Sequence, residues 1–329
     1  MVKEVSKMKE IKKLMFYYAI TSLHMGSGSK LGPVDQPIQR ETHTNFPLLP
    51  SSGIKGGFRE LVESTGEQGE KDAKILFGTD QGSSEGSSKP GIITFTDARI
   101  LFFPVKSLFG VFAWVICPSV LNRLKEDLKF VGRDDLLSAD ISNLSVHEGE
   151  IVLFGKNPSL VKDSKVTLES FTFNVKEPRC SLLDVLLKNI PKDLLGNGFG
   201  AKLNQDVVIV SDDIFKYFVV NSTEIVPRIQ IGKESGTVSE GGNFWYEENV
   251  PPQTIFYSMV LVNPVLERSK QAVNQTTNEG SQENPGNVDE NEKLFKEYIN
   301  SCYIQLGGNQ TIGRGFLKYR VFDEPSMEG

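Results

Sequence analysis

Short apolar stretches alternate with polar, glycine-rich stretches along the whole chain, and this pattern predicts an α+β protein. Apolar runs, unbroken or at every second position, predict strands. Those strands cover residues 14–20, 92–95, 99–105, 110–117, 165–175, 207–210, 225–231, 254–262 and 316–322. Apolar residues at helical spacing predict helices over residues 51–62, 118–129, 182–190, 212–219 and 292–302, with a loop at residues 196–200.

The order of the predicted elements indicates the architecture. A short β–α–β pattern stands near each end of the chain, which is typical of a ferredoxin-like or RNA-recognition-motif-like sheet with insertions. We therefore expect a single domain over residues 1–329. Residues 64–90 and 263–291 are interpreted as flexible insertions because small and polar residues dominate them. Residues 232–252 contain glycine turn signals followed by adjacent aromatic residues, and they predict a protruding β-hairpin.

Composition narrows the classes of function. The 329 residues are 39% apolar and 24% charged, as in ordinary globular proteins, and no apolar run reaches the ~18 residues of a membrane span. The formal net charge of −6 disfavours a basic nucleic-acid coat, so any nucleic-acid contact must use a local groove or an assembly of subunits. The 3 cysteines and 3 histidines disfavour a disulfide framework, a zinc site and a histidine-rich metal centre, and they fit a reducing cytoplasm.

The most distinctive stretch is the glycine- and proline-rich segment at residues 23–41, which follows the first predicted strand. Pro33 and Pro37 prevent a helix here and bias the residues before them toward extended backbone. Asp35 stands between these prolines, so we expect a stiff loop that presents its carboxylate to solvent. The Gly26-Ser27-Gly28 motif resembles the start of a dinucleotide-binding loop, but the helix that such a loop requires cannot form. The other alternative is a surface loop without a ligand.

The predicted helix at residues 51–62 begins with a serine cap and carries glycines in its first turns. Each glycine destabilises a helix by about 1 kcal/mol relative to alanine, so something is expected to press against this end. Lys55, Arg59 and the free N–H groups make the helix N-terminus suited to an anion. The alternative is close packing against a neighbouring strand. The glycines are Gly53, Gly56 and Gly57.

Several segments together resemble the repeated backbone subunit of type III-B CRISPR (Cmr) effector complexes, a family within the RAMP superfamily. The segments occur in the family's order between residues 20 and 316, interrupted by the two polar stretches. Each match is modest alone, and the set is highly specific. The segments are residues 23–47, residues 101–115 continuing into 118–123, residues 222–229, Trp-Tyr-Glu-Glu at 245–248, and Gly-Gly-Asn-Gln-Thr-Ile-Gly-Arg-Gly-Phe at 307–316.

The resemblance implies a RAMP fold with an RNA-recognition-motif-like palm, finger insertions and a protruding thumb hairpin. It implies that copies of the chain stack into a helical filament on a guide crRNA, together with other subunits of the complex and away from membranes. Each thumb is expected to insert between the guide and a complementary target RNA and to displace one nucleotide. The family cleaves target RNA at those regular intervals in a metal-dependent reaction, as part of antiviral defence.

The resemblance also implies roles for individual residues. The family's central aspartate falls on Asp35, as the catalytic residue and as a ligand of a divalent metal ion, Mg²⁺ or Mn²⁺. The histidine of the same motif is His24. Tyr246 and Glu247 are implied as further catalytic-site residues. Many family sequences have a tyrosine where this chain has Asn249, so a role of that tyrosine ring does not carry over to this chain. The implied RNA-binding residues are Ser52, Gly53, Lys55, Arg59, Phe244, Trp245, Gly307, Gly308 and Arg314.

Two functional hypotheses follow from these residues. Aspartate is a weak general base at neutral pH, so we expect Asp35 to hold a hydrated metal ion or to orient the attacking 2′-hydroxyl. In that hypothesis the chain is a guide-dependent endoribonuclease. The alternative is a non-catalytic scaffold that holds the guide while another subunit cuts the target. The intact loop around Asp35 favours the endoribonuclease.

Overall fold

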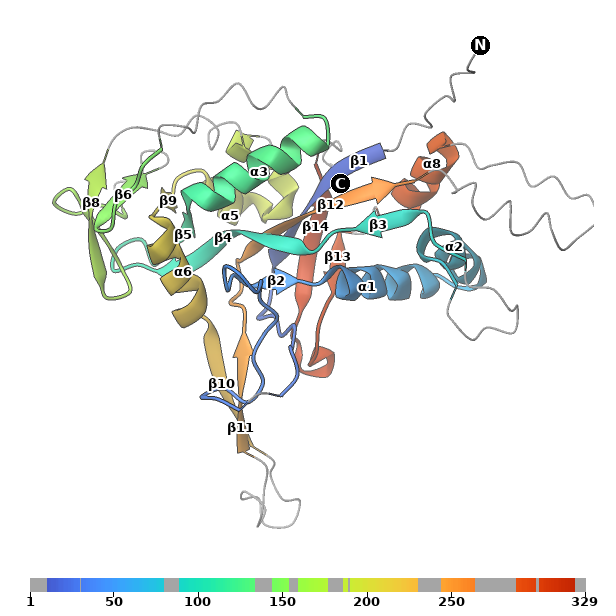
Figure 1. The fold of residues 1–329 in the computed structure, drawn as a ribbon, viewed down its shortest axis with the longest axis horizontal. Coiled ribbons are helices and arrows are strands. Elements are labelled where there is room, and N and C mark those ends of the chain that lie inside the picture. The colour runs from blue at the N-terminus through green and yellow to red at the C-terminus, as the bar shows by residue number, and fades with distance from the viewer. Residues whose placement is uncertain are drawn as a thin grey trace, which may run out of the picture.

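Both ends of the chain contribute strands to one large sheet, which forms the body of the molecule (Figure 1). The structure is a computed structural model that describes residues 11–29, 31–79, 89–133, 144–153, 159–176, 186–188, 190–229, 244–263, 288–299 and 302–322. Helices and strands are mixed along the chain, so the predicted α+β class is confirmed. Within the described residues, no helix is both long and apolar enough to cross a membrane.

The sheet has 12 strands, and their order in space differs from their order along the chain. The pairs β5–β9 and β6–β8 are parallel, whereas the other pairs are antiparallel, so the sheet is mixed. Two strands lie off the main path, where β2 (Leu48–Leu49) pairs with β4 and β3 (Ile93–Phe95) pairs with β12. The main path is β13 (Tyr303–Gln305), β14 (Phe316–Val321), β1 (Ile11–Ala19), β12 (Ile255–Val262), β4 (Ala98–Lys106), β5 (Phe112–Ile116), β9 (Val207–Ile209), β6 (Glu150–Leu153), β8 (Phe171–Lys176) and β7 (Lys165–Leu168).

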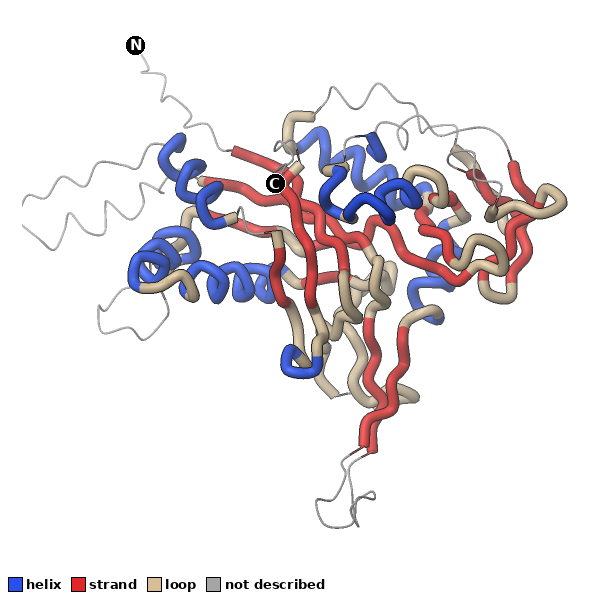
Figure 2. Tube along the Cα trace, turned by 180° about the vertical axis from the view of Figure 1, so that it is seen from behind, coloured by secondary structure: helices blue, strands red, loops and turns tan. Residues whose placement is uncertain are grey.

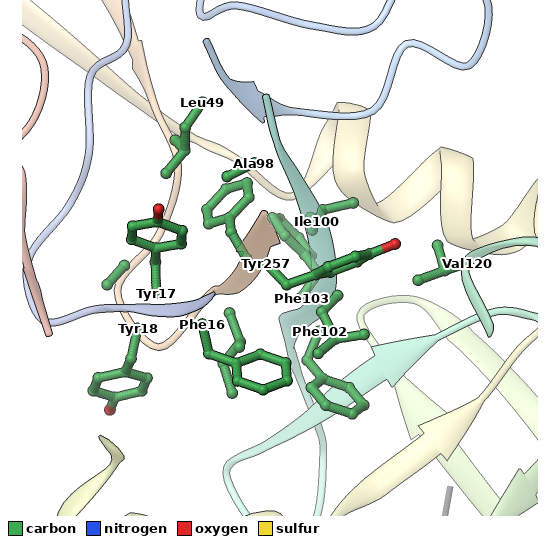
Figure 3. Packing of buried hydrophobic residues seen from close by; sticks show 14 of the residues in the cluster. Phe16, Tyr17, Tyr18, Leu49, Ala98, Ile100, Phe102, Phe103, Val120 and Tyr257 are labelled. Carbon is green, nitrogen blue, oxygen red and sulfur yellow. The ribbon is translucent and has the colours of Figure 1, made fainter. Parts of the chain in front are cut away.

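Strand β1 is central because it pairs on both of its edges, with β12 on one side and β14 on the other. Residues 14–19 are all buried, which explains why the apolar run in the sequence is unbroken. The register places Phe16 of β1 opposite Tyr257 of β12, and Figure 3 shows both residues in the hydrophobic core. The phenol of Tyr17 is satisfied inside this core by the Ser258 hydroxyl at 3.0 Å. The first and last segments of the chain are therefore held together by the sheet itself.

Helices cover the sheet through apolar faces. The ring of Phe58 in α1 contacts the rings of Phe95 on β3 and Tyr319 on β14, with centroid distances of 5.2 and 4.9 Å. Helix α3 begins at Pro118, and its predicted apolar face is buried. The described α-helices are α1 (Ser51–Glu63), α2 (Glu67–Phe77), α3 (Pro118–Phe130), α5 (Gly196–Leu203), α6 (Asp212–Asn221) and α8 (Val288–Tyr298).

Several segments differ from the sequence prediction, which includes neither strand β6 nor strand β13. Residues 67–77 form helix α2 inside the stretch predicted as a flexible insertion, because Ala73, Leu76 and Phe77 are buried on one of its faces. Residues 196–203 form helix α5 instead of a loop. The predicted strand at residues 165–175 is the antiparallel pair β7–β8. Residues 80–88 and 264–287 of the predicted insertions lie outside the described residues, as do parts of the helix predicted at residues 182–190.

The glycines of α1 differ in their surroundings, and this difference predicts opposite effects of alanine. A Cβ at Gly57 would overlap Leu306 Cδ2 and lie 3.2 Å from the Gln305 carbonyl oxygen, whereas nothing lies within 4 Å of a Cβ at Gly56. Gly57→Ala is expected to destabilise the fold by about 1–3 kcal/mol because the adjoining segment must move. Gly56→Ala is expected to stabilise it by about 1 kcal/mol, because alanine favours a helix. Thermal unfolding of both variants measures the difference, and equal stability would contradict the packing.

Strands β10 (Glu224–Ile229) and β11 (Phe244–Asn249) form a separate two-stranded ribbon that projects from the body (Figures 1 and 2). They pair in antiparallel register from Glu224 opposite Asn249 to Ile229 opposite Phe244. We call this ribbon the thumb. It lies where the sequence predicts a protruding hairpin, and its stem begins earlier than the predicted residues 232–252. Residues 230–243 lie outside the described residues.

Candidate functional site

Three segments that are far apart in the sequence meet at the base of the thumb. They are the first glycine-rich loop (residues 23–41), strand β11 and the last glycine-rich loop (residues 306–315). Leu23 and Val250 exchange two backbone hydrogen bonds of 2.9 Å, and the His24 carbonyl accepts one of 3.0 Å from the Gly308 N–H. The two glycine-rich loops of the sequence therefore lie side by side at the base of the thumb.

Asp35 is exposed on the first loop, as the flanking prolines predict. Its Oδ2 accepts a 2.8 Å hydrogen bond from the Tyr246 N–H. The next residue, Gln36, donates to the Tyr246 carbonyl at 3.0 Å and accepts from the Glu248 N–H at 3.0 Å. Gln36 thus forms a parallel bridge to Glu247, and the loop acts as a short third strand beside the thumb. The carboxylate of Asp35 is held at a fixed place on β11.

His24 is buried beneath the first loop. Its Nδ1 lies 2.7 Å from the Glu248 carbonyl oxygen. A carbonyl only accepts, so Nδ1 is the donor and carries the hydrogen. A Cβ at Gly26 would lie 2.8 Å from His24 Nε2, so any larger residue at position 26 would collide with the imidazole ring in its present place. This placement makes His24 a residue that shapes the loop from within the protein.

Glu247 is buried, with 2% of its surface exposed, and it connects the thumb to the last loop. Its Oε2 accepts a 2.8 Å hydrogen bond from Asn309 Nδ2 and lies 3.7 Å from Arg228 Nε. Asn309 has a left-handed backbone with φ of 66°, which asparagine tolerates better than most residues. A buried carboxylate with these partners favours a positioning role over direct contact with RNA.

The aromatic residues of β11 lie on two faces of the thumb. Phe244 and Tyr246 are 54% and 38% exposed, and their rings meet edge to face at 5.0 Å. Opposite them in the register stand Ile229 and Pro227, so this face of the ribbon is apolar and exposed. Trp245 alternates to the other face, where its indole N–H is buried. Phe244 and Tyr246 therefore form the exposed aromatic pair, whereas the sequence-based prediction names Phe244 and Trp245.

The N-terminus of α1 is capped differently from the prediction. The N-cap residue is Pro50, and the Ser51 N–H donates to the carboxylate of Asp97 at 2.7 Å, so the predicted serine cap is wrong. This carboxylate occupies part of the space that the prediction gives to an external anion. Ser52 is exposed, and Lys55 is half-buried with no ion-pair partner among the described residues. These two side chains remain suited to a phosphate.

Other predicted RNA-binding residues serve internal contacts. Arg59 donates to the Gly78 carbonyl and lies 3.6 Å from Glu63, so it joins α1 to α2. Arg314 lies 3.5 Å from Glu224 at the base of the thumb. Gly307, with φ of 80°, lies against the His24 carbonyl, and Gly53 lies against Met25, where a Cβ would come within 2.7 Å of Cε. Close packing, the alternative considered for the helix glycines, therefore applies to Gly53 and Gly57.

The sequence analysis missed a charged pair beside the site, the buried Glu248 and the half-buried Arg40. Glu248 Oε1 accepts hydrogen bonds from Arg40 Nη2 at 2.5 Å and from the Thr223 hydroxyl at 2.9 Å. Its Oε2 accepts from the Ile38 N–H at 3.1 Å. Charged residues in a polar stretch carry no burial signal in one sequence, so only the fold reveals them.

The side chains near Asp35 could bind a metal ion only if water molecules supplied most of its ligands. Among the described residues, no group of three or more His, Cys, Asp or Glu side chains is arranged to hold a metal. Asp35 offers a single exposed carboxylate, and one of its oxygens already accepts from Tyr246. Mg²⁺ is commonly bound through one or two carboxylates together with substrate phosphates. The site therefore fits a metal ion shared with an RNA phosphate and does not fit a protein-only cage.

This fold and site belong to a known class of proteins. The sequence profile of the RAMP superfamily matches residues 16–318, so the chain belongs to the RAMP superfamily. Among its relatives is the protein named CRISPR system Cmr endoribonuclease Cmr4 from Pyrococcus furiosus. The two are 37% identical over 310 residues, which make up 93% of this chain and 94% of that protein. The resemblance to the backbone subunits of type III-B CRISPR complexes is thereby confirmed.

More distant relatives and solved structures agree with this assignment. The CRISPR system CMR subunit Cmr4 from Saccharolobus solfataricus is 26% identical over 95% of this chain and 97% of that protein. The crystal structure of oligomeric Cmr4 from Pyrococcus furiosus matches with a TM-score of 0.65 and 30% identity, over 94% of this chain and 97% of that one. A type III-B Cmr-beta structure bound to cognate target RNA matches with a TM-score of 0.68 at 20% identity, which supports the RAMP fold.

Proposed function

We propose that this chain is the repeated backbone subunit of a type III-B CRISPR effector complex and is its target-cleaving endoribonuclease. One observation carries the proposal: the exposed carboxylate of Asp35 is fixed to the base of a projecting thumb by the Tyr246 N–H. The relative with 37% identity over 93% of the chain is named an endoribonuclease. A pure scaffold would not need an exposed carboxylate held at this place.

The partners in this proposal are a guide crRNA, a complementary target RNA, further copies of the chain and other subunits of the complex. The Pyrococcus furiosus relative is described as oligomeric. A net charge of −6 suits a subunit whose RNA contacts are local and are shared within an assembly. The complex acts in the cytoplasm, which agrees with Cys117 and Cys302 forming no disulfide bond among the described residues.

In this function the protein binds the backbone of the guide RNA and does not recognise its base sequence. Ser52 and Lys55 at the start of α1 contact guide phosphates, which position RNA but carry no sequence information. Base pairing between the guide and the target supplies the specificity. The exposed pair of Phe244 and Tyr246 stacks on bases at the point where the thumb enters the duplex. One nucleotide of the target is displaced there.

Cleavage follows from the position of Asp35 next to that displaced nucleotide. A displaced nucleotide brings its 2′-hydroxyl into line with the neighbouring phosphorus, and such alignment supplies a large part of rate enhancement. Asp35 orients this hydroxyl and holds a hydrated Mg²⁺ or Mn²⁺ ion through its carboxylate. When bound, that ion stabilises the negative charge that develops on the phosphate. His24 and Glu247 keep the two glycine-rich loops in place around the carboxylate.

Removal of divalent metal tests this proposal. The assembled complex is given a labelled complementary RNA, and cutting is expected at regular intervals with Mg²⁺ or Mn²⁺ present. Excess chelator is expected to stop cutting and to leave target binding intact, because base pairing holds the target. A non-complementary RNA is the control and is expected to stay whole. Cutting that continues at the same rate without divalent metal would contradict the metal-dependent mechanism. A complex that binds the target but never cuts would support the scaffold alternative.

A further inference from the structure

Glu248 is the point at which the first loop, the thumb and helix α6 are joined. Its carboxylate accepts from the backbone of Ile38 in the first loop and from Thr223, which follows α6 and precedes β10. Its third donor is Arg40, at the end of the first loop, with an Nη2–Oε1 distance of 2.5 Å. These three donors thus lie on segments that border Asp35 or support the thumb.

The backbone of Glu248 also bonds to the first loop, in addition to its side chain. The Glu248 N–H donates to the Gln36 carbonyl at 3.0 Å, and the Glu248 carbonyl accepts from His24 Nδ1 at 2.7 Å. With the bond from Tyr246 to Asp35, three residues of the first loop, Asp35, Gln36 and Ile38, are bonded to β11. The backbone of Gln36 bonds on both sides of Glu247, which is the parallel pairing of one residue of an added strand.

Arg40 extends this connection into the body of the protein. Its Nη1 donates to the Asn45 carbonyl at 2.8 Å and to the Val219 carbonyl in α6 at 3.0 Å. The side chains of Arg40 and Glu248 are 13% and 8% exposed, so the ion pair is largely removed from water. Buried charges that lose their partner are strongly unfavourable, and this makes the geometry of the pair hard to change.

We propose that Glu248 is a positioning residue that fixes Asp35 to the thumb, so that the cleaving carboxylate and the displaced nucleotide keep one relative position. This inference deepens the proposed function and rests on it. Glu248 acts in this proposal through Ile38, Gln36 and the main chain leading to Asp35, and its carboxylate is occupied by donors of the protein itself. The register of the loop on β11 then determines which phosphodiester is cut. When the thumb moves, the carboxylate of Asp35 moves with it, because it is bonded to β11.

The test replaces Glu248 by glutamine within the assembled complex. Glutamine keeps the size but has one acceptor oxygen where three donors converge, so either Ile38 or Arg40 loses its acceptor. A displacement of about 1 Å at a reacting group lowers rate by about 10²-fold. We therefore expect the single-turnover cleavage rate to fall by about 10²-fold while guide retention and target affinity stay unchanged. Cuts at neighbouring phosphodiesters are expected to appear.

Two further variants separate positioning from folding. Thr223→Val removes one hydrogen bond to Glu248 Oε1 with little change of shape, and it is expected to give a smaller loss in the same direction. Asp127→Asn is the matched control, because Asp127 is also a buried carboxylate, with Arg99 and the Tyr257 hydroxyl each at 2.8 Å, but it does not contact the first loop. Asp127→Asn is expected to lower thermal stability and to leave the rate of cleavage per folded complex unchanged.

The decisive comparison uses Asp35→Asn as the background. If Glu248 acts through Asp35, the double variant Asp35→Asn/Glu248→Gln is expected to cut the target at the same residual rate as Asp35→Asn alone. Additive losses in the double variant, or wild-type cleavage by a folded Glu248→Gln complex, would overturn the inference. If Asp35→Asn itself cuts at the wild-type rate, the catalytic assignment in the proposed function fails as well. A loss in Asp35→Asn with none in Glu248→Gln or Thr223→Val rejects the positioning role alone.

Discussion

Replacing Asp35 by asparagine is expected to lower cleavage of the target RNA by about 10²-fold, the usual effect of losing one positioned catalytic group. The side-chain oxygen of asparagine still accepts the hydrogen bond from the Tyr246 N–H, so the loop keeps its place on β11. The variant loses only the negative charge that would hold the metal ion of the proposed mechanism. Assembly of the complex, guide retention and target binding are therefore expected to persist. A single-turnover cleavage assay on the assembled complex measures the change.

A matched control separates this effect from a general loss of charge. Asp163 stands beside β7, the strand at the far end of the sheet path, and has a left-handed backbone with φ of 53°. Asparagine tolerates this conformation as well as aspartate does. Asp163→Asn removes the same charge from the chain at a position outside the site. It is expected to cut at the wild-type rate.

Removing the exposed aromatic pair of the thumb is expected to have the second largest effect. Phe244→Ala/Tyr246→Ala removes the two exposed rings that the proposal assigns to base stacking, and each base–aromatic contact contributes about 1–3 kcal/mol. The displaced nucleotide is then less often formed, so cutting is expected to fall by at least tenfold and the spacing of the remaining cuts to blur. Guide binding is expected to survive, because the proposal assigns the guide phosphates to the start of α1 and not to the thumb. Sequencing-gel analysis of the products measures both the rate and the cut positions.

The control for the thumb variant is another exposed aromatic residue. Phe130 at the end of α3 is 48% exposed, and its ring lies 4.0 Å from Lys12 Nζ, away from the thumb. Phe130→Ala is expected to leave both the rate and the spacing of cuts as they are. If the thumb variant cuts at unchanged positions and rate, the thumb does not displace the nucleotide.

The parts of the fold that the sequence predicts are those in which local pattern and final environment agree. The apolar run at residues 14–20 is a central strand, and Pro118 begins α3 where a helix start is predicted. Pro33 and Pro37 place Asp35 at the surface because their restriction is a property of the local backbone.

The parts that could not be predicted depend on contacts between distant segments. Helix α5 is rich in glycine, which disfavours a helix. It forms because its Phe199 packs near the rings of Tyr18 on β1 and Trp114 on β5. Helix α2 lies in a polar stretch, and its buried face is visible only once α1 lies beside it. Glu248 looks like a surface residue in the sequence, because its partners Arg40 and Thr223 are fixed near it only by the fold. Tertiary contacts override local preference in all three cases.

The most direct test of the account measures target binding and target cutting on one preparation of the Asp35→Asn complex. A labelled RNA complementary to the guide is used at saturating Mg²⁺, with the wild-type complex measured in parallel. The account predicts an unchanged Kd for the target and a cleavage rate that is lower by about 10²-fold. A complex that binds the target with the wild-type Kd and still cuts it at the wild-type rate would contradict the assignment of cleavage to this chain's Asp35.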